Sequence, residues 1–258
     1  EYARNFPCST NPNDYTNGSY STTYPNTATI TQTAQSASQS VTVTCNLAAL
    51  AVTKTAAGTY DRTVTWTLTK SVNPTTQSGQ AGQVAGTSTW TIVADKTEVS
   101  NNYAVTGNIS IHNPAAIAQT FTVADVLNGT PVPTVTVNCP SLTAAAGGDV
   151  VCTYSAAPTN GSATLNTVTV TAAGNGPRTA TAAVAFIENL IGHDSGPLAD
   201  THLNISQTIA GDTTLTPTET FNCPSDVLLY TNGVYTFPVV NTVTLGGSIN
   251  LSASATVT

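Results

Sequence analysis

Apolar and polar residues alternate with a period of two along most of this chain. In residues 60–70, Val64, Trp66 and Leu68 alternate with threonines. Successive side chains of a β-strand point to opposite faces, so this pattern predicts half-buried strands. The strands expected in the middle of the chain are 50–53, 60–70, 87–93, 103–111, 120–126, 132–139, 150–155, 165–172 and 180–186.

Turn signals separate these predicted strands. They are short runs of Gly, Asn and Pro, such as Asn73-Pro74 and Asn160-Gly161. Short strands at regular spacing with such signals between them favour an all-β sandwich or barrel. We therefore expect residues 47–187 to form one complete antiparallel β-sandwich, with Trp66 and Trp90 in its core.

Two distant parts of the chain resemble each other at a fixed offset. Residues 26–30 (Asn-Thr-Ala-Thr-Ile) return as residues 241–245 (Asn-Thr-Val-Thr-Leu). Three further pairs have the same spacing of 215 positions (223 − 8, 230 − 15 and 235 − 20): Cys8 and Cys223, Tyr15 and Tyr230, and Tyr20 and Tyr235. A gapless repeat indicates one supersecondary unit used twice.

The two copies differ in what precedes them. Strand-like residues 198–221 lead into the second copy, whereas seven residues stand before Cys8. Residues 1–46 are therefore expected to form an incomplete β-module, and residues 188–258 a second β-module with added front strands. In the first copy we expect strands at 19–24, 27–33 and 41–45, with a polar turn at 32–39. In the second we expect a linker at 188–197, then strands at 201–209, 218–223, 234–240, 241–245 and 249–257.

The five cysteines predict two disulfides. Cys8 and Cys45 bracket the first module, so a bond between them would tie its start to its last strand. Cys139 and Cys152 are closely spaced on β-rich sequence, which indicates a second bond and an oxidising compartment. Cys223 is left over. We expect a free buried thiol there; the alternatives are a lost partner or a partner on another chain.

Charged residues are scarce and limit the classes of partner. They make up 7% of the chain, and the net charge is −7 with six basic residues, each standing singly. Nucleic-acid and anionic-membrane surfaces need clustered Lys and Arg, so neither partner is expected. No apolar run of about 18 residues exists, so no bilayer span is expected. The chain begins at Glu1 and lacks methionine, which we interpret as a mature end left after a signal peptide; the alternative is a chain boundary of another origin.

The segment from Tyr60 to Val72 resembles a recurring element of large secreted bacterial surface proteins. In those proteins an aromatic-containing strand ending in Lys-Ser-Val opens an immunoglobulin-like repeat. The similarity continues at residues 102–114, 123–127, 139–140, 152–154 and 166–170. It implies tandem immunoglobulin-like antiparallel β-sandwich modules on a cell exterior, and it implies no ligand and no chemistry. In such proteins the two module types alternate, so this chain is similar to one period cut inside a module.

Candidate catalytic and metal-binding residues do not form a recognisable pattern. His193, Asp194 and Ser195 are adjacent and cannot face one another as a triad. Asp95, Glu98 and Asp125 lack the spacing of a calcium loop and are expected to be solvated turn acids. We therefore predict no catalytic residue, no metal site, no cofactor and no enzymatic activity.

Two kinds of covalent modification were weighed and not favoured. A Lys–Asn isopeptide bond could form from Lys54 or Lys70 beside a buried acid such as Glu188, but the sequence carries no marker for it. Asn-x-Ser/Thr sequons make surface glycans a weak expectation in a chain so rich in Thr and Ser. They occur at Asn17, Asn108, Asn128, Asn160, Asn204 and Asn250.

Three functions are compared. An incomplete module leaves an open strand edge and an open apolar face, which a second copy would close by strand addition. This favours a structural subunit of an extracellular filament or surface polymer that assembles head-to-tail. The alternative is a stalk or adhesin segment with loops 77–86 and 174–178 at its tips. A carbohydrate-active protein is disfavoured, because Trp66 and Trp90 occupy inward positions and no paired carboxylates are evident.

Overall fold

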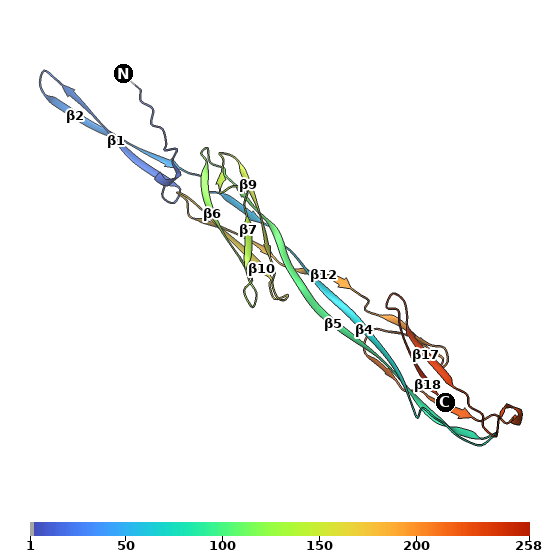
Figure 1. Cartoon of the computed structure of the whole chain (residues 1–258). Helices are drawn as coiled ribbons and strands as arrows, with labels where there is room; N and C mark the ends of the chain where they lie inside the picture. Colours follow the sequence, from blue (N-terminus) through green and yellow to red (C-terminus); the bar gives the residue numbers. More distant parts are fainter. Residues whose placement is uncertain (1–2) are drawn as a thin grey trace. The chain divides into compact units, whose positions relative to one another are not determined.

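The computed structural model describes residues 3–258, and regular structure in that range consists of β-strands and two short 3₁₀ helices (Figure 1). The strands pair antiparallel in several sheets, which confirms the predicted all-β class. Glu1, interpreted above as a processed end, lies outside the described residues. Within residues 3–258 no helix has the length and hydropathy needed to cross a membrane.

The chain folds into two compact units, each built from two stretches of sequence. The first unit contains the residues up to Tyr60 together with Asn101–Glu188. The second contains Asp61–Ser100 together with Asn189–Thr258. The predicted sandwich at 47–187 is thus divided, because its residues 61–100 group with the C-terminal part of the chain.

The length of two strands explains this division. Strand β4 spans Ala57–Asn73 and β5 spans Val84–His112, so both continue from one unit into the other. The sequence predicts two strands, 87–93 and 103–111, where the structure has β5 alone. The intervening residues look like a loop because they are charged and polar. Their charges are used within the sheet: Lys96 Nζ lies 2.5 Å from Glu98 Oε1.

The first unit consists of a hairpin followed by strands of two sheets. Its elements besides β4 and β5 are η1 (Pro12–Asp14), β1 (Ser19–Ile30), β2 (Gln35–Asn46), β3 (Ala51–Lys54), β6 (Gln119–Leu127), β7 (Val135–Asn138), β8 (Thr143–Ala144), β9 (Asp149–Ala156), β10 (Leu165–Ala172) and β11 (Pro177–Ala183). One sheet has the order β11-β10-β6-β8, and β5 pairs with β3 and β9 in the other. The alternation of these strands places Ile109, Ile111, Val168 and Val170 in the core between the sheets, all fully buried.

The second unit is also a sandwich. Its remaining elements are β12 (Phe186–Ile191, which begins in the first unit), β13 (Gly196–Asp200), β14 (Ile205–Ile209), β15 (Thr213–Leu215), β16 (Thr218–Asn222), η2 (Val227–Leu229), β17 (Val239–Leu245) and β18 (Leu251–Val257). One sheet has the order β14-β13-β17-β18, and β15 and β16 pair with β5 in the other. The segment expected to be a linker, 188–197, contains most of β12 and the start of β13.

Both tryptophans are buried, as predicted, but in the second unit rather than in a sandwich formed by residues 47–187 alone. Trp66 is 9% exposed and Trp90 is fully buried. The indole N–H of Trp66 donates to the His193 carbonyl at 2.8 Å, and that of Trp90 donates to Glu219 Oε2 at 2.9 Å. Their polar atoms are therefore satisfied, and their rings contribute to the core.

Substitution of Leu245 measures how much the repeated segment contributes to the stability of the second unit's core. Its side chain is fully buried, whereas Ile30, 215 positions earlier, is 54% exposed. We expect Leu245→Ala to lower the free energy of unfolding by about 2–5 kcal/mol, since it leaves a cavity. The matched change Ile30→Ala should alter it by less than about 0.5 kcal/mol in the monomer. Urea denaturation of the three proteins measures both; equal effects would contradict the described packing.

A candidate assembly surface

The two copies of the repeat have the same local structure before their strands. Each begins with a 3₁₀ turn, Pro12–Asp14 in the first copy and Val227–Leu229 in the second. The preceding residue caps each turn: the side chain of Asn11 accepts from the Asn13 backbone N–H, and that of Asp226 accepts from Leu228. The gapless offset in sequence is therefore a repeat in structure as well.

A pair of tyrosines follows each turn with the same geometry. The Tyr15 and Tyr20 rings lie 5.7 Å apart at 50°, and the Tyr230 and Tyr235 rings lie 5.8 Å apart at 49°. The hydroxyl of Tyr230 donates to the backbone carbonyl of Pro224 at 2.8 Å. In the first copy the hydroxyl of Tyr15 donates to the equivalent carbonyl, that of Ser9, at the same distance. Burial raises the pKa of Tyr230, and Cys223 and Tyr235 beside it act in the same direction.

The hairpin that follows has one polar face and one mixed apolar face. On the polar face of β1 and β2, hydroxyls pair across the strands, as in Thr27 with Ser38 at 2.8 Å. The corresponding pair in β17 and β18 is Thr242 with Ser254 at 2.7 Å. On the opposite face of the first hairpin, cross-strand partners include Tyr24 with Val41, Ala28 with Ala37 and Ile30 with Gln35.

The apolar face is covered in one copy and open in the other. In the second copy Val243 and Leu245 are fully buried, because β13 and β14 extend the sheet and the opposite sheet packs on it. In the first copy the described residues provide no third strand for the β1–β2 sheet. Ile30 is consequently 54% exposed and Val41 is 47% exposed.

The base of the first hairpin is anchored within its own unit. Tyr15, Cys45, Leu47 and Ala115 form a small buried cluster there. The backbone N–H of Gly18 donates to a carbonyl of the β10–β11 loop, that of Gly174, at 2.7 Å. The anchored base and the exposed far part make β1–β2 a hairpin held at one end only.

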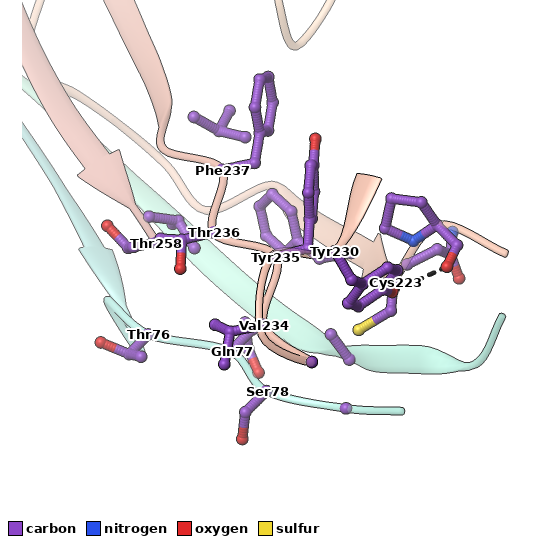
Figure 2. Close-up of a pocket in the computed structure, with 18 residues that line it drawn as sticks. Thr76, Gln77, Ser78, Cys223, Tyr230, Val234, Tyr235, Thr236, Phe237 and Thr258 are labelled. Atoms are coloured by element: carbon purple, nitrogen blue, oxygen red, sulfur yellow. Dashed lines mark hydrogen bonds between the residues drawn. The ribbon is translucent and has the colours of Figure 1, made fainter. Parts of the chain in front are cut away.

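The corresponding end of the second copy borders an open groove in the second unit. The groove has a volume of about 470 Å³, and its lining mixes apolar and aromatic side chains with polar ones such as Gln77 and Thr258 (Figure 2). Phe237 and Val234 on its wall are 61% and 63% exposed. Other lining residues are Phe221, Tyr235, Val239 and Val257. Beside it, β18 is the last strand in the order β14-β13-β17-β18.

The cysteines occupy three settings. Cys8 is bonded to Cys45 at the base of the first hairpin, and Cys139 is bonded to Cys152 in the first unit. Cys223 is the free cysteine of the described chain, and it is half-buried rather than fully buried. The free thiol thus lies in the groove wall, at the position where the first copy has its bonded Cys8.

The acidic residues considered for calcium do not meet. Asp125 lies in the first unit against Lys54, whereas Asp95 and Glu98 lie in the second unit. Residues 3–258 contain no cluster of three or more His, Cys, Asp or Glu side chains suited to a metal ion.

Asp194, one of the residues weighed for a triad, belongs to an ion-pair network. The Arg62 guanidinium and the Lys96 ammonium donate to its carboxylate, at 2.5 Å and 3.0 Å for the closest atoms. These two cations hold the pKa of Asp194 well below its usual range. The backbone carbonyl of the neighbouring His193 accepts from Trp66, so this turn has structural contacts on both sides.

The other two histidines each face a carboxylate. His112 Nδ1 lies 2.8 Å from Asp149 Oδ1, and His202 Nε2 lies 2.8 Å from Glu219 Oε1. The two pairs lie in different units.

A comparison with known protein families finds none that matches this chain, and no curated protein is significantly similar to it. The candidate function therefore depends on the sequence and structure described above.

The cysteine assignment makes a direct prediction. Under denaturing, non-reducing conditions the chain should react with one equivalent of maleimide, because four of its five sulfurs are in disulfides. Cys223→Ser should abolish the labelling, and mass spectrometry reads out both proteins. Three or more reactive thiols in the unreduced protein would contradict the two disulfides.

Proposed function

We propose that this protein is a structural subunit of an extracellular filament or cell-surface polymer, in which each copy is completed by its neighbour. The observation that carries the proposal is the β1–β2 hairpin, whose apolar face is exposed while the same face of its repeat, β17–β18, is buried in a sandwich. The same repeated sequence unit is therefore buried where it forms β17–β18 and exposed where it forms β1–β2.

The open hairpin presents two features that favour association. No further strand lies beside the outer edge of β1 or of β2 in the described sheets, so both edges are open to strand addition. Its apolar face offers Ile30 and Val41, each of which contributes about 1.5–3 kcal/mol when fully buried. Strand addition by another copy satisfies both at once: main-chain hydrogen bonds form along an edge, and alternate side chains enter a groove.

The acceptor in this proposal is the groove of the second unit together with the edge strand β18. The edge is that of Leu251–Val257, because the backbone of the next residue, Thr258, already bonds Thr75 and Gln77. The groove wall already contains exposed aromatic and branched side chains, Phe237 and Val234 among them. Because the hairpin and the groove are different surfaces, the contact is head-to-tail. Head-to-tail contacts produce open fibres unless the rotation between copies closes a ring.

The chemistry of the chain supports an extracellular setting. Two disulfides are typical of proteins that fold in an oxidising compartment. Low charge with a surface of hydroxyls also suits closely packed neighbouring copies, since few charged groups lose water on association. The resemblance to surface proteins with immunoglobulin-like repeats agrees with the same location. A stalk segment of a larger surface protein is the competing function, and the next experiment separates the two.

An aspartate on the hairpin face should prevent assembly without affecting the fold. In Ile30→Asp the charge would be buried unpaired at the contact, so we expect the extent of polymerisation to fall at least about tenfold. The matched control is Val132→Asp, at a position 69% exposed in the first unit and outside the hairpin. Light scattering and negative-stain electron microscopy of the wild type and both variants provide the readout.

The outcomes decide between the two functions. Fibres from the wild type and from Val132→Asp, with discrete particles from Ile30→Asp, support the filament. A wild type that stays monomeric at high concentration supports a stalk segment instead. Equal fibres from all three proteins would show that polymerisation does not use the β1–β2 face.

A further inference from the structure

Each unit buries a lysine against an aspartate between its two sheets. In the first unit Lys54 Nζ lies 2.8 Å from Asp125 Oδ2, and in the second unit Lys70 Nζ contacts Asp200 Oδ2. All four side chains are fully buried. Burial of an ion pair costs several kcal/mol per charge, so two such pairs in a chain with six basic residues call for an explanation.

A buried asparagine lies beside the first pair. Asn166 is fully buried and its Nδ2 donates to Asp125 Oδ2 at 3.4 Å, the same oxygen that Lys54 contacts. Asn166 Oδ1 and Asp125 Oδ1 have no hydrogen-bond partner. The aspartate oxygen therefore bridges the amine and the amide, and the amide carbonyl remains unsatisfied.

The second unit contains the same three residue types, with Lys70 against Asp200 and a buried asparagine, Asn241. Asn241 is 1% exposed, and neither its Nδ2 nor its Oδ1 has a hydrogen-bond partner. The spacing is the same in sequence, 41 positions from aspartate to asparagine in both units (166 − 125 and 241 − 200). Asp200 and Asn241 lie on β13 and β17, as Asp125 and Asn166 lie on β6 and β10.

The strand register places each asparagine diagonally next to its aspartate. In the first unit Asp125 is opposite Val168, two residues after Asn166. In the second unit Leu198 is opposite Leu245 and Ala199 is opposite Thr244. One further step of that register sets Asp200 opposite Val243, again two residues after the asparagine. Residues two apart on a strand share a face, so aspartate and asparagine point to the same side of the sheet in both units.

The lysines come from the opposite sheet and are covered by aromatic rings. Lys54 is on β3 and Lys70 is on β4, both in the sheet that contains β5. Lys54 Nζ lies 3.5 Å from the centre of the Tyr154 ring, and Lys70 Nζ lies 5.1 Å from that of Trp90. Both lysines are thus enclosed, and each faces a carboxylate of the opposite sheet. The asparagine next to that carboxylate is placed by a hydrogen bond in the first site and by the strand register in the second.

We propose that each lysine forms an amide cross-link to its asparagine, Lys54 to Asn166 and Lys70 to Asn241, with release of ammonia. The aspartate first takes a proton from the ammonium, which leaves a neutral amine. The amine nitrogen attacks Cγ of the asparagine, the new C–N bond forms, and the bond from Cγ to Nδ2 breaks. Between the ammonium and the amide the lysine nitrogen loses two protons. The aspartate passes both to the leaving nitrogen, which departs as ammonium, the protonated form of ammonia, so no oxidant is needed.

The environment of the first site favours the reactive protonation states. Burial lowers the pKa of Lys54, and the attraction of Asp125 only partly opposes this effect. A neutral amine is the nucleophilic form, and lowering the pKa of a lysine by burial is a general means of activating it. The Asn166 carbonyl oxygen, which has no hydrogen-bond partner, gains negative charge during attack. Asp125 is hydrogen-bonded to the amide nitrogen of the same side chain and carries the transferred proton. Asp125 therefore acts as acid and base and is not consumed.

The acid in these sites differs from the one considered in the sequence. Glu188 is exposed and its Oε2 accepts from the Tyr60 hydroxyl at 2.8 Å. The structure instead brings together residues that are 71 and 130 positions apart in the two Lys–Asp pairs. A cross-link at either site would covalently join the two sheets of its sandwich. The proposal does not depend on polymerisation and applies equally to a monomer.

Intact-protein mass spectrometry tests the proposal directly. After denaturation and reduction, the full chain should weigh about 34 Da less than its sequence mass, about 17 Da for each ammonia lost. Lys54→Arg and Asn166→Ala should each restore about 17 Da, as should Lys70→Arg and Asn241→Ala in the second unit. Asp125→Ala should also restore about 17 Da, although both reacting residues remain. Lys96→Arg, in the ion-pair network of the second unit, is the matched control and should keep both losses.

Proteolysis followed by sequencing of the linked peptides assigns the bonds. Peptides joined through Lys54 and Asn166, and through Lys70 and Asn241, are the expected result. A wild-type mass equal to the sequence mass, with only linear peptides, overturns the proposal. A loss of about 18 Da per site, with the lysine joined to aspartate, overturns the assignment of asparagine as the group attacked. The wild-type measurement decides the matter even if a variant does not fold.

Discussion

A two-stranded β-sheet cannot bury an apolar face or satisfy its own outer edges, and this constraint separates β1–β2 from the other sheets of the structure. At the base of β1 and β2 the apolar side chains are buried, because Tyr15, Cys45 and Leu47 form a small cluster there. Further along, the hydroxyls of the polar face pair across the strands. On the other face Phe6 and Arg4 pack against Tyr24, but Ile30 stays 54% and Val41 47% exposed. Two strands alone are marginally stable in water, so completion by another surface is the physically favoured outcome.

The second copy shows what completion achieves for the same sequence pattern. There β13 and β14 extend the sheet, the opposite sheet packs on it, and Val243 and Leu245 are fully buried. The turns, the tyrosine pairs and the cross-strand hydroxyls are equivalent in both copies, so local sequence determines these features. What differs is tertiary context, and the exposure of Ile30 follows from context rather than from the residue.

The sequence predicts local structure well and long-range structure poorly, for identifiable reasons. Alternation around Trp66 correctly predicts a strand and a buried ring, because a period of two is a local property. The charged stretch near Lys96 looks like a loop in the sequence, so β5 is predicted as two strands. Its ionic partner Asp194, which lies far away in the sequence, cannot be identified from local pattern. The same limitation hides the Lys54, Asp125 and Asn166 site. No spacing rule links a lysine to an acid 71 positions away, so the sequence alone does not identify Asp125 as the partner of Lys54, and Glu188 is an equally plausible acid.

A polymer of this protein under load could fail within a sandwich or at the contact between two copies. Hydrogen-bonded strands and packed apolar side chains can slide or separate under load, and a low-charge chain has few ion pairs to oppose this. Covalent bonds between the sheets would leave each sandwich unable to open while its linkages are intact, whatever holds one copy to the next. The contact through β1–β2 would then be the weakest point of a polymer, since it is noncovalent. Its strength would depend on the length of the 12-residue strands and on the apolar face that the hairpin keeps exposed.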